Sequence, residues 1–255
     1  MRSGCFVELR KDDRDMTEPT HEELARFYDR EAVRSIDAAT YRLMWYRFRV
    51  MMGMIEGRGR RILEVGAGDG DVVVTLSERG YTCYAMDISE VRLAKYKERA
   101  EAHRITQLLG SVEDHIPLED ASLDVVLCGE VMEHVPDNDR AFEEIRRVLR
   151  PGGQLIVSVP YRESLKIATC PDCGKTFELN GHLHTYDLSS LRSLFAYHGF
   201  EVVQTHIGHT KVSRVVWSRW QSGLSLFLCR VLDGLTSRAF RASDTWLMMK
   251  GVCKP

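Results

Sequence analysis

Short apolar runs alternate with segments in which apolar residues recur every three or four positions. The short runs predict buried strands, and the periodic segments predict amphipathic helices. Strands are expected at residues 61–65, 81–86, 107–109, 123–128, 154–159, 201–205 and 246–252. Helices are expected at residues 71–79, from residue 89 onward, at 139–149 and at 188–198. This alternation predicts a three-layer, Rossmann-like α/β fold with a doubly wound, seven-stranded and mostly parallel sheet, in which the last two strands are free to run antiparallel.

Three segments add to this core pattern. Residues 21–57 predict two helices, and residues 1–57 are expected to form an N-terminal helical cap on a domain that spans residues 58–255. Residues 160–181 are expected to be irregular. Residues 211–241 combine apolar positions at helical spacing with arginines, which predicts an amphipathic helical insertion before the last strand. That helix could pack on the core or in an oligomer interface, form a lid over an apolar acceptor, or make peripheral contact with an anionic membrane.

The composition restricts the partners and the compartment. The 255-residue chain has a formal net charge of -2. Proteins that bind long nucleic acid usually carry a large positive charge, so nucleic acid is not the expected partner. The first residues lack the apolar core of a signal peptide, and no apolar run reaches the roughly 18 residues needed to span a bilayer. Seven scattered cysteines suit a reducing compartment, and a cytoplasmic location is expected.

A glycine loop follows the first strand of the predicted sheet. Gly66, Gly68 and Gly70 lie between that strand and a helix, where backbone must approach a ligand closely. Their spacing suits a ligand without a pyrophosphate, and Glu64 would attract a cationic ligand where it would repel a phosphate. Asp87, at the end of the second strand, is placed to accept hydrogen bonds from both ribose hydroxyls. The alternatives are a plain turn with a helix cap and an NAD-binding oxidoreductase, which Glu64 disfavours.

Residues 62–70, Ile-Leu-Glu-Val-Gly-Ala-Gly-Asp-Gly, resemble motif I of the class I S-adenosylmethionine-dependent methyltransferases of the type 11 kind. Residues 116–126, residues 130–135, the turn 149–153 and the pair Gly199 and Phe200 extend the resemblance over residues 60 to 205. It implies the family's fold and S-adenosylmethionine as cofactor, and leaves the acceptor open. The implied cofactor-binding residues are Glu64, Gly66, Ala67, Gly68, Gly70, Asp87, Ile88, Ser111, Val112 and Cys128.

The residues after the fourth strand are the candidates for methyl transfer. Glu130, Glu133 and His134 are expected on one face of a helix, because they stand at positions i, i+3 and i+4. His134 would act as general base, or the three residues would only shape the pocket wall. Alternatively they bind a divalent cation, with His182 or His184 as a further ligand. The Glu-x-x-Glu-His pattern resembles that of the ubiquinone-pathway O-methyltransferases and of the small-RNA 2′-O-methyltransferases. Both subfamilies depend on a metal ion, so the resemblance implies a metal at these residues.

Cys170 and Cys173 have the spacing of a zinc knuckle. Two further ligands are needed, and His182 and His184 could supply one or both, which would make residues 161–186 a structural zinc clip. The alternatives are a reduced free pair and a redox pair. The zinc clip and the active site compete for His182.

These observations predict a methyltransferase that acts on a small-molecule or lipid-like acceptor, at oxygen. The rival interpretations are a metal-dependent RNA 2′-O-methyltransferase and a non-catalytic, adenosylmethionine-binding regulatory protein. The oligomeric state stays open.

Overall fold

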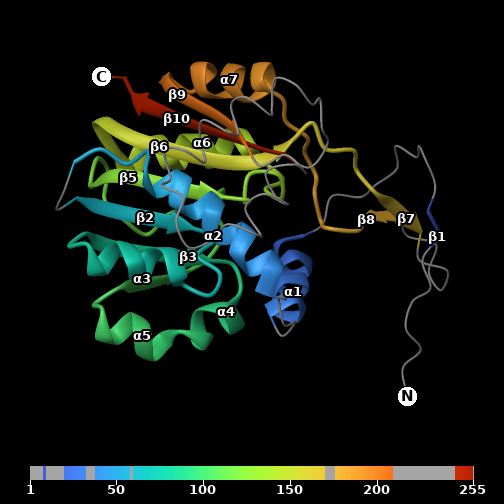
Figure 1. Cartoon of the computed structure of the whole chain (residues 1–255), viewed down its shortest axis with the longest axis horizontal. Coiled ribbons are helices and arrows are strands. Elements are labelled where there is room, and N and C mark those ends of the chain that lie inside the picture. Colours follow the sequence, from blue (N-terminus) through green and yellow to red (C-terminus); the bar gives the residue numbers. More distant parts are fainter. Residues whose placement is uncertain are drawn as a thin grey trace.

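The computed structural model describes residues 8–9, 20–32, 38–57, 60–169, 176–208 and 245–254. Its centre is a seven-stranded sheet of order β4-β3-β2-β5-β6-β10-β9 (Figure 1). The strands are β2 (Arg61–Val65), β3 (Thr82–Asp87), β4 (Thr106–Leu109), β5 (Leu123–Gly129), β6 (Leu149–Tyr161), β9 (Phe200–Gly208) and β10 (Thr245–Cys253). The first five pair in parallel, and β10 runs antiparallel to both β6 and β9. The predicted Rossmann-like, mostly parallel sheet is confirmed.

Helices cover both faces of this sheet. They are α1 (His21–Ala32), α2 (Ala38–Met52), α3 (Asp71–Glu78), α4 (Glu90–Lys95), α5 (Lys97–Ala102), α6 (Asn138–Val148) and α7 (Leu188–Tyr197). Neighbouring strand residues point to opposite faces, so Leu63 joins the core under α6 and α7, whereas Ile62 joins the core under α2 and α3. Burial on both faces explains why the strands read as continuous apolar runs.

Two expected elements differ from the structure. The single helix expected from residue 89 is divided into α4 and α5, because Tyr96 has the non-helical angles φ -119° and ψ 21°. The stretch 160–181, expected to be irregular, contains the hairpin β7 (Ile167–Thr169) and β8 (Thr176–Glu178). With β1 (Glu8–Leu9) these strands form a second, three-stranded sheet, which lies beyond α1 and away from the main sheet in Figure 1.

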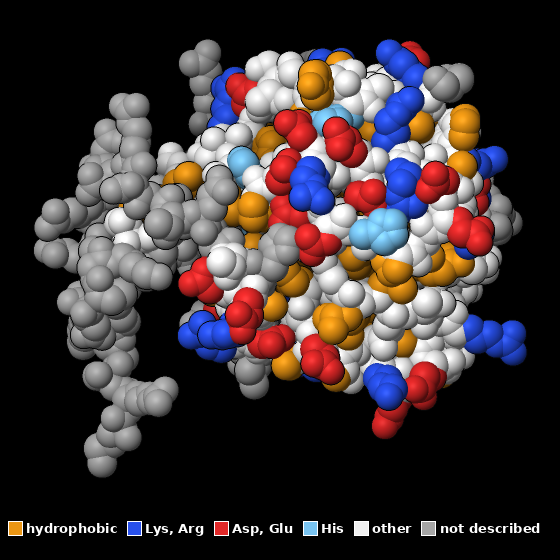
Figure 2. Space-filling model, turned by 180° about the vertical axis from the view of Figure 1, so that it is seen from behind, with side chains coloured by type: hydrophobic (Ala, Val, Ile, Leu, Met, Phe, Trp, Pro, Cys, Tyr) orange, Lys and Arg blue, Asp and Glu red, His pale blue; other side chains and the backbone are white. Residues whose placement is uncertain are grey.

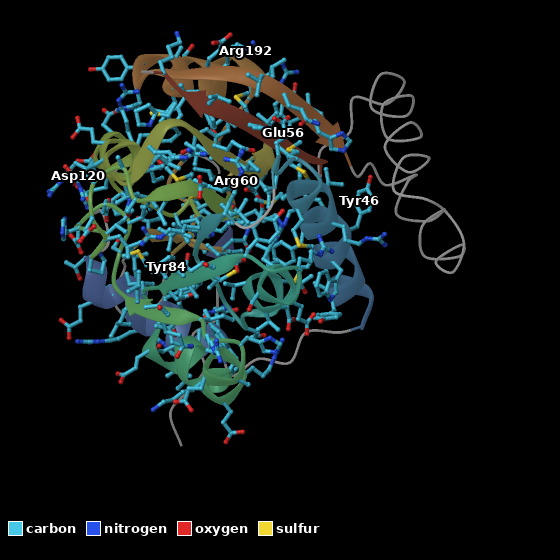
Figure 3. The ribbon with its side chains drawn as sticks, turned by 90° about the vertical axis from the view of Figure 1, so that its left-hand side faces the viewer. Tyr46, Glu56, Arg60, Tyr84, Asp120 and Arg192 are labelled. Atoms are coloured by element: carbon cyan, nitrogen blue, oxygen red, sulfur yellow. The ribbon has the colours of Figure 1, made fainter. Side chains whose placement is uncertain are left out.

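Both helices expected near the N-terminus are present, and α2 shares a core with the sheet. Its Tyr46 and Val50 are buried in one cluster with Ile62 and Met248. Figure 3, in which Tyr46 is labelled, shows α2 lying alongside the ribbon of the α/β core. Helix α1 instead contacts α4, the helix that follows Asp87. A division at residue 57 into cap and domain stays a prediction.

The described surface carries both signs of charge. Acidic and basic side chains are intermixed over the face seen in Figure 2, in keeping with a net charge near zero. Among the described residues, no helix combines the length and the apolar character needed to cross a membrane. The predicted amphipathic helix at 211–241 lies outside the described residues, and its membrane contact and the cytoplasmic location stay predictions.

Candidate active site

The glycine loop leaves β2 in a conformation that favours glycine. Gly66, Gly68 and Gly70 have φ of 68°, 55° and 76°. A Cβ on Gly66 would lie 2.4 Å from the Val131 side chain. The amides of Gly66 and Ala67 both donate to the carbonyl oxygen of Met86, at 2.8 and 3.0 Å, which fixes the loop against the end of β3. The shape of the loop is therefore set mainly by backbone angles and backbone hydrogen bonds.

Two buried carboxylates flank the loop. Burial raises the pKa of Glu64 well above its usual range, and its Oε2 has no hydrogen-bond partner among the described residues. Asp87 accepts hydrogen bonds from the amides of Gly68 and Ser89, both at 2.9 Å. Burial also raises the pKa of Asp87, although these amides oppose the shift. Glu64 can thus accept a hydrogen bond from a cationic ligand, and Asp87 retains lone pairs for further donors.

A cavity of about 310 Å³ opens above the loop. Eight of the ten predicted cofactor-binding residues line it, namely Glu64, Gly66, Ala67, Gly68, Asp87, Ile88, Ser111 and Val112. Gly70 and Cys128 are not among the lining residues. Gly70 packs beneath the loop against Tyr96, and Cys128 is fully buried in β5, where burial raises the pKa of its thiol. The wall opposite the loop comes from α1 and α2, and His134 lines the same cavity.

The turn after β5 is not a helix, so the expected helical face of Glu130, Glu133 and His134 is wrong. Glu130 has φ 57°, in the left-handed region, and its amide donates to the carbonyl oxygen of Ser158 at 2.9 Å. This backbone bond continues the β5–β6 pairing, and the left-handed backbone at Glu130 then turns the chain before a helix can begin. Residues 132–134 form a turn, and α6 starts only at Asn138.

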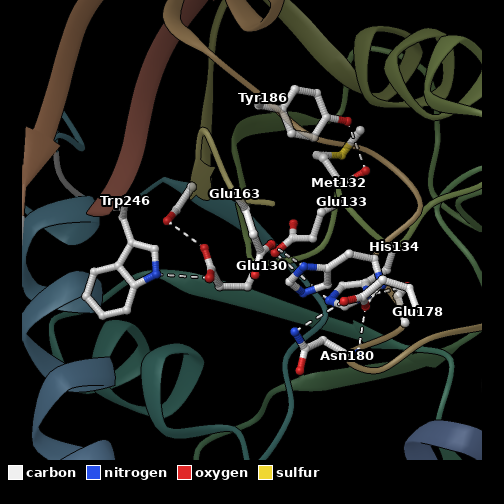
Figure 4. A network of polar contacts seen from close by, with 12 residues as sticks. Glu130, Met132, Glu133, His134, Glu163, Glu178, Asn180, Tyr186 and Trp246 are labelled. Atoms are coloured by element: carbon white, nitrogen blue, oxygen red, sulfur yellow. Dashed lines mark hydrogen bonds and ion pairs between the residues drawn. The ribbon is translucent and has the colours of Figure 1, made fainter. Parts of the chain in front are cut away.

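Glu130 is held by three donors from other elements. Its Oε1 accepts from the Ser158 hydroxyl at 3.1 Å, and its Oε2 accepts from the Trp246 indole at 3.0 Å (Figure 4). The Arg47 guanidinium lies 3.0 Å from the same Oε2, and it also lies 4.9 Å from the ring centroids of Phe48 and Trp246. Glu130 therefore joins α2 to the strands β6 and β10.

Glu133, His134 and His182 form a compact buried cluster. Each offers one ligand atom, and these atoms lie within 4.8 Å of one another. Glu133 is 1% exposed, both of its carboxylate oxygens lack a hydrogen-bond partner among the described residues, and burial raises its pKa well above the usual range. Burial, together with the neighbouring His182, lowers the pKa of His134 to about 4. The cluster can bind a proton or a cation.

The ring nitrogens of His134 have different surroundings. Its Nδ1 lies 3.0 Å from the carbonyl oxygen of Gly181, which can only accept a hydrogen bond. Nδ1 is therefore the donor in this pair, and Nε2, which lies 3.9 Å from Glu133 Oε1, is the basic nitrogen.

His182 and His184 point to different places. The His182 Nδ1 contacts Glu163, and its amide donates to Glu178 at 2.9 Å. Burial lowers the pKa of His182, but the contact with Glu163 outweighs burial, and the pKa is raised. The His184 Nε2 lies 2.9 Å from the carbonyl oxygen of Val135 instead. His182 is thus the histidine that joins the cluster. Cys170 and Cys173, the other expected zinc ligands, lie outside the described residues.

Sequence reasoning missed four residues around this site: Tyr28, Arg47, Glu163 and Trp246. Arg47 carried a signal, because it is a cation in a helix otherwise rich in methionine and aromatic residues. The other three offered none, since only the fold brings their side chains to the turn after β5.

Comparison with known proteins matches this chain to methyltransferases. The methyltransferase domain family matches residues 63–157. The ubiquinone/menaquinone biosynthesis C-methyltransferase UbiE of Bartonella henselae is 27% identical over 60% of this chain and 65% of that protein. The ubiquinone biosynthesis O-methyltransferase of Klebsiella pneumoniae is 29% identical over 39% of this chain. The chain spans 65% and 42% of the lengths of these two relatives.

A solved structure resembles nearly the whole chain. The 1,6-didemethyltoxoflavin-N1-methyltransferase of Burkholderia thailandensis, with bound S-adenosylhomocysteine, covers 97% of this chain and is itself fully covered. Its TM-score of 0.61 at 18% identity establishes the fold alone. The names of the three similar proteins refer to transfer to carbon, oxygen and nitrogen, so the likeness leaves the reacting atom open. Together with the sheet order, these findings confirm the resemblance to class I S-adenosylmethionine-dependent methyltransferases, and the matched methyltransferase domain spans residues 63–157.

Proposed function

We propose that this chain transfers the methyl group of S-adenosylmethionine to an oxygen atom of a small or lipid-like acceptor. One observation carries the proposal: Gly66 and Asp87 on the cofactor side and His134 on the other side line a single cavity. A donor held at the glycine loop and an acceptor beside His134 would therefore share one enclosed space. Alignment of the two reactants is the main requirement of a displacement at a methyl carbon.

The loop residues fit this cofactor. The glycines give its methionine part close access to the backbone, and the unpartnered Glu64 oxygen favours a cationic ligand. The free lone pairs of Asp87 suit the ribose hydroxyls. Bound there, S-adenosylmethionine supplies an electrophilic methyl group on a positively charged sulfur. We assign contact roles to the eight lining residues and packing roles to Gly70 and Cys128.

His134 is the proposed general base. Its lowered pKa keeps the imidazole neutral near pH 7, and Nε2 is the nitrogen free to take a proton from the acceptor hydroxyl. Glu133 Oε1 lies next to Nε2, and the ionised carboxylate would stabilise the imidazolium that forms. Glu130, whose two oxygens are already engaged, would hold Arg47 and the turn in place.

The acceptor side of the cavity is largely apolar. Tyr41, Met44, Trp45 and Phe48 of α2 line it, and successive aromatic rings of this helix meet edge to face with centroids 6.4 Å apart. Such a wall favours an acceptor with an apolar body, and an aromatic ring in particular. We therefore propose hydroxylated aromatic compounds as the first acceptors to test.

A divalent cation is a second candidate for the same place. The compact cluster of Glu133, His134 and His182 supports it, because a carboxylate and two imidazoles are ligand types common to transition metals. A cation held there would lower the pKa of an acceptor hydroxyl. Structural zinc at Cys170 and Cys173, RNA 2′-O-methylation and a purely regulatory role stay predictions.

A turnover screen tests these proposals. Purified protein is incubated with S-adenosylmethionine and a panel of phenols, aliphatic alcohols, amines and a short RNA, and release of S-adenosylhomocysteine is measured. Turnover of phenols that survives exhaustive chelation supports His134 as base, whereas loss on chelation and recovery with added metal supports the cation. Binding of the cofactor without turnover of any acceptor would contradict the proposed activity.

A further inference from the structure

Tyr28 of α1 lines the cavity, and its hydroxyl has no partner among the described residues. The hydroxyl oxygen is also buried. A buried hydroxyl without a partner destabilises a protein, because it has given up its hydrogen bonds to water. A phenylalanine would avoid that cost, so the hydroxyl is expected to find its partner in a ligand.

The ring of Tyr28 lies next to the proposed base. Its centroid is 5.5 Å from that of His134, and the two rings meet edge to face at 86°. On the cofactor side, the Arg92 guanidinium carbon lies 6.0 Å from the Tyr28 ring centroid, over the ring. Burial raises the pKa of the Tyr28 hydroxyl, and the nearby carboxylates of Glu133 and Asp87 raise it further.

Helix α1 is held firmly in this position. The Ser89 hydroxyl donates to Asp29 at 2.6 Å, and Lys95 donates to the carbonyl oxygen of Ala32. Both donors belong to the segment that directly follows Asp87. Because its neighbours on α1 are fixed to the segment that follows Asp87, Tyr28 is held in a defined place on the cavity wall.

We propose that the Tyr28 hydroxyl donates a hydrogen bond to the acceptor oxygen that receives the methyl group; this inference rests on the proposed function. The acceptor proton passes to His134 Nε2, and the oxygen forms its bond to the methyl carbon. The bond from that carbon to sulfur breaks, the electron pair stays on sulfur, and His134 later releases the proton to water. The hydrogen bond from Tyr28 directs one oxygen lone pair at the methyl group and stabilises the anionic oxygen.

The test uses a chromophoric phenol, so it needs no natural acceptor. 4-Nitrocatechol is titrated into full-length protein saturated with S-adenosylhomocysteine, and the visible absorption of its phenolate reports binding and the pKa of the bound phenol. Tyr28→Phe removes only the hydroxyl. We expect about tenfold weaker binding of the phenolate and a raised pKa of the bound phenol, because one hydrogen bond to the anion is lost.

Two controls separate the possible outcomes. Tyr96→Phe removes a buried hydroxyl that does not line the cavity, and it should change neither measurement. The affinity for S-adenosylhomocysteine, measured by calorimetry, should be unchanged in Tyr28→Phe. Unaltered 4-nitrocatechol binding in Tyr28→Phe, or an equal loss of S-adenosylhomocysteine affinity, would overturn the inference. Wild-type protein that binds S-adenosylhomocysteine but no 4-nitrocatechol would instead contradict the proposed acceptor, and this inference with it.

Discussion

The two sides of the cavity are built by different means. The cofactor side consists mainly of backbone from two short segments, residues 64–70 and 87–89, which follow neighbouring parallel strands. The proposed acceptor side consists of side chains from α1, α2 and the turn 130–134. A backbone site is specified by local sequence, whereas a side-chain site depends on how distant elements pack.

This difference determines how each side can be damaged. A glycine loop loses its ligand affinity when a new side chain disfavours its backbone angles or fills the space beside it. The chemical nature of that side chain matters little. On the acceptor side, chemistry and packing are separate, because His134 faces the cavity whereas Arg47 and Glu130 hold the wall together. Substitutions on the two sides should therefore affect different measurements.

The largest effect is expected at His134. His134→Ala removes the proposed base and should lower kcat by about 10²- to 10⁴-fold, while the affinity for S-adenosylhomocysteine stays within about twofold of wild type. Steady-state turnover of the best phenol from the screen and calorimetry measure the two quantities. His103→Ala, on the surface beside α5, is the matched control and should change neither. A parallel loss of cofactor affinity in His134→Ala would mean that the two sides are not separate.

The second effect concerns the ion pair between buried Arg47 and half-buried Glu130. Arg47→Met leaves the Glu130 carboxylate without its cation in the protein interior, and the free energy of unfolding should fall by about 3 kcal/mol. Urea unfolding measures the change. Adding Glu130→Gln should restore part of the loss, because the uncompensated charge is then removed. If the double variant is as unstable as the sum of the two single variants, the pair does not act as a unit.

The third prediction breaks the cofactor side alone. Gly66→Ala places a Cβ at a φ of 68° and 2.4 Å from the Val131 side chain, so affinity for S-adenosylhomocysteine should fall by about tenfold or more. Gly152→Ala is the matched control, since its φ of 76° is similar but no atom lies within 4 Å. Both variants bear the conformational strain, and only the first should lose affinity. Equal losses in calorimetry would show that general instability is responsible.

The same difference explains how far sequence reasoning could reach. The strands, the glycine loop and Asp87 were predictable because the apolar runs and glycines that indicate them lie close together in the sequence. The predicted range of β2, residues 61–65, matches the structure at both ends. The helical face of Glu130, Glu133 and His134 was wrong, because periodicity alone cannot reveal a left-handed Glu130 whose amide pairs with Ser158. Tyr28 and Glu163 reach the site through tertiary packing, which no local pattern specifies.

The smallest effect is expected from pH, and it tests the burial of His134. With a pKa of about 4, the base stays neutral down to pH 5, so kcat/KM should change by less than about twofold between pH 7 and 5. A base with the ordinary histidine pKa of about 6.5 would lose well over tenfold in the same interval. The pKa of His134 is lower in the folded protein than in the unfolded chain, so the unfolded chain binds more protons and stability falls as pH drops below about 6.5. Circular dichroism at each pH therefore has to accompany the rates, and an acid limb near pH 6.5 in protein that is still folded would contradict His134 as the buried base.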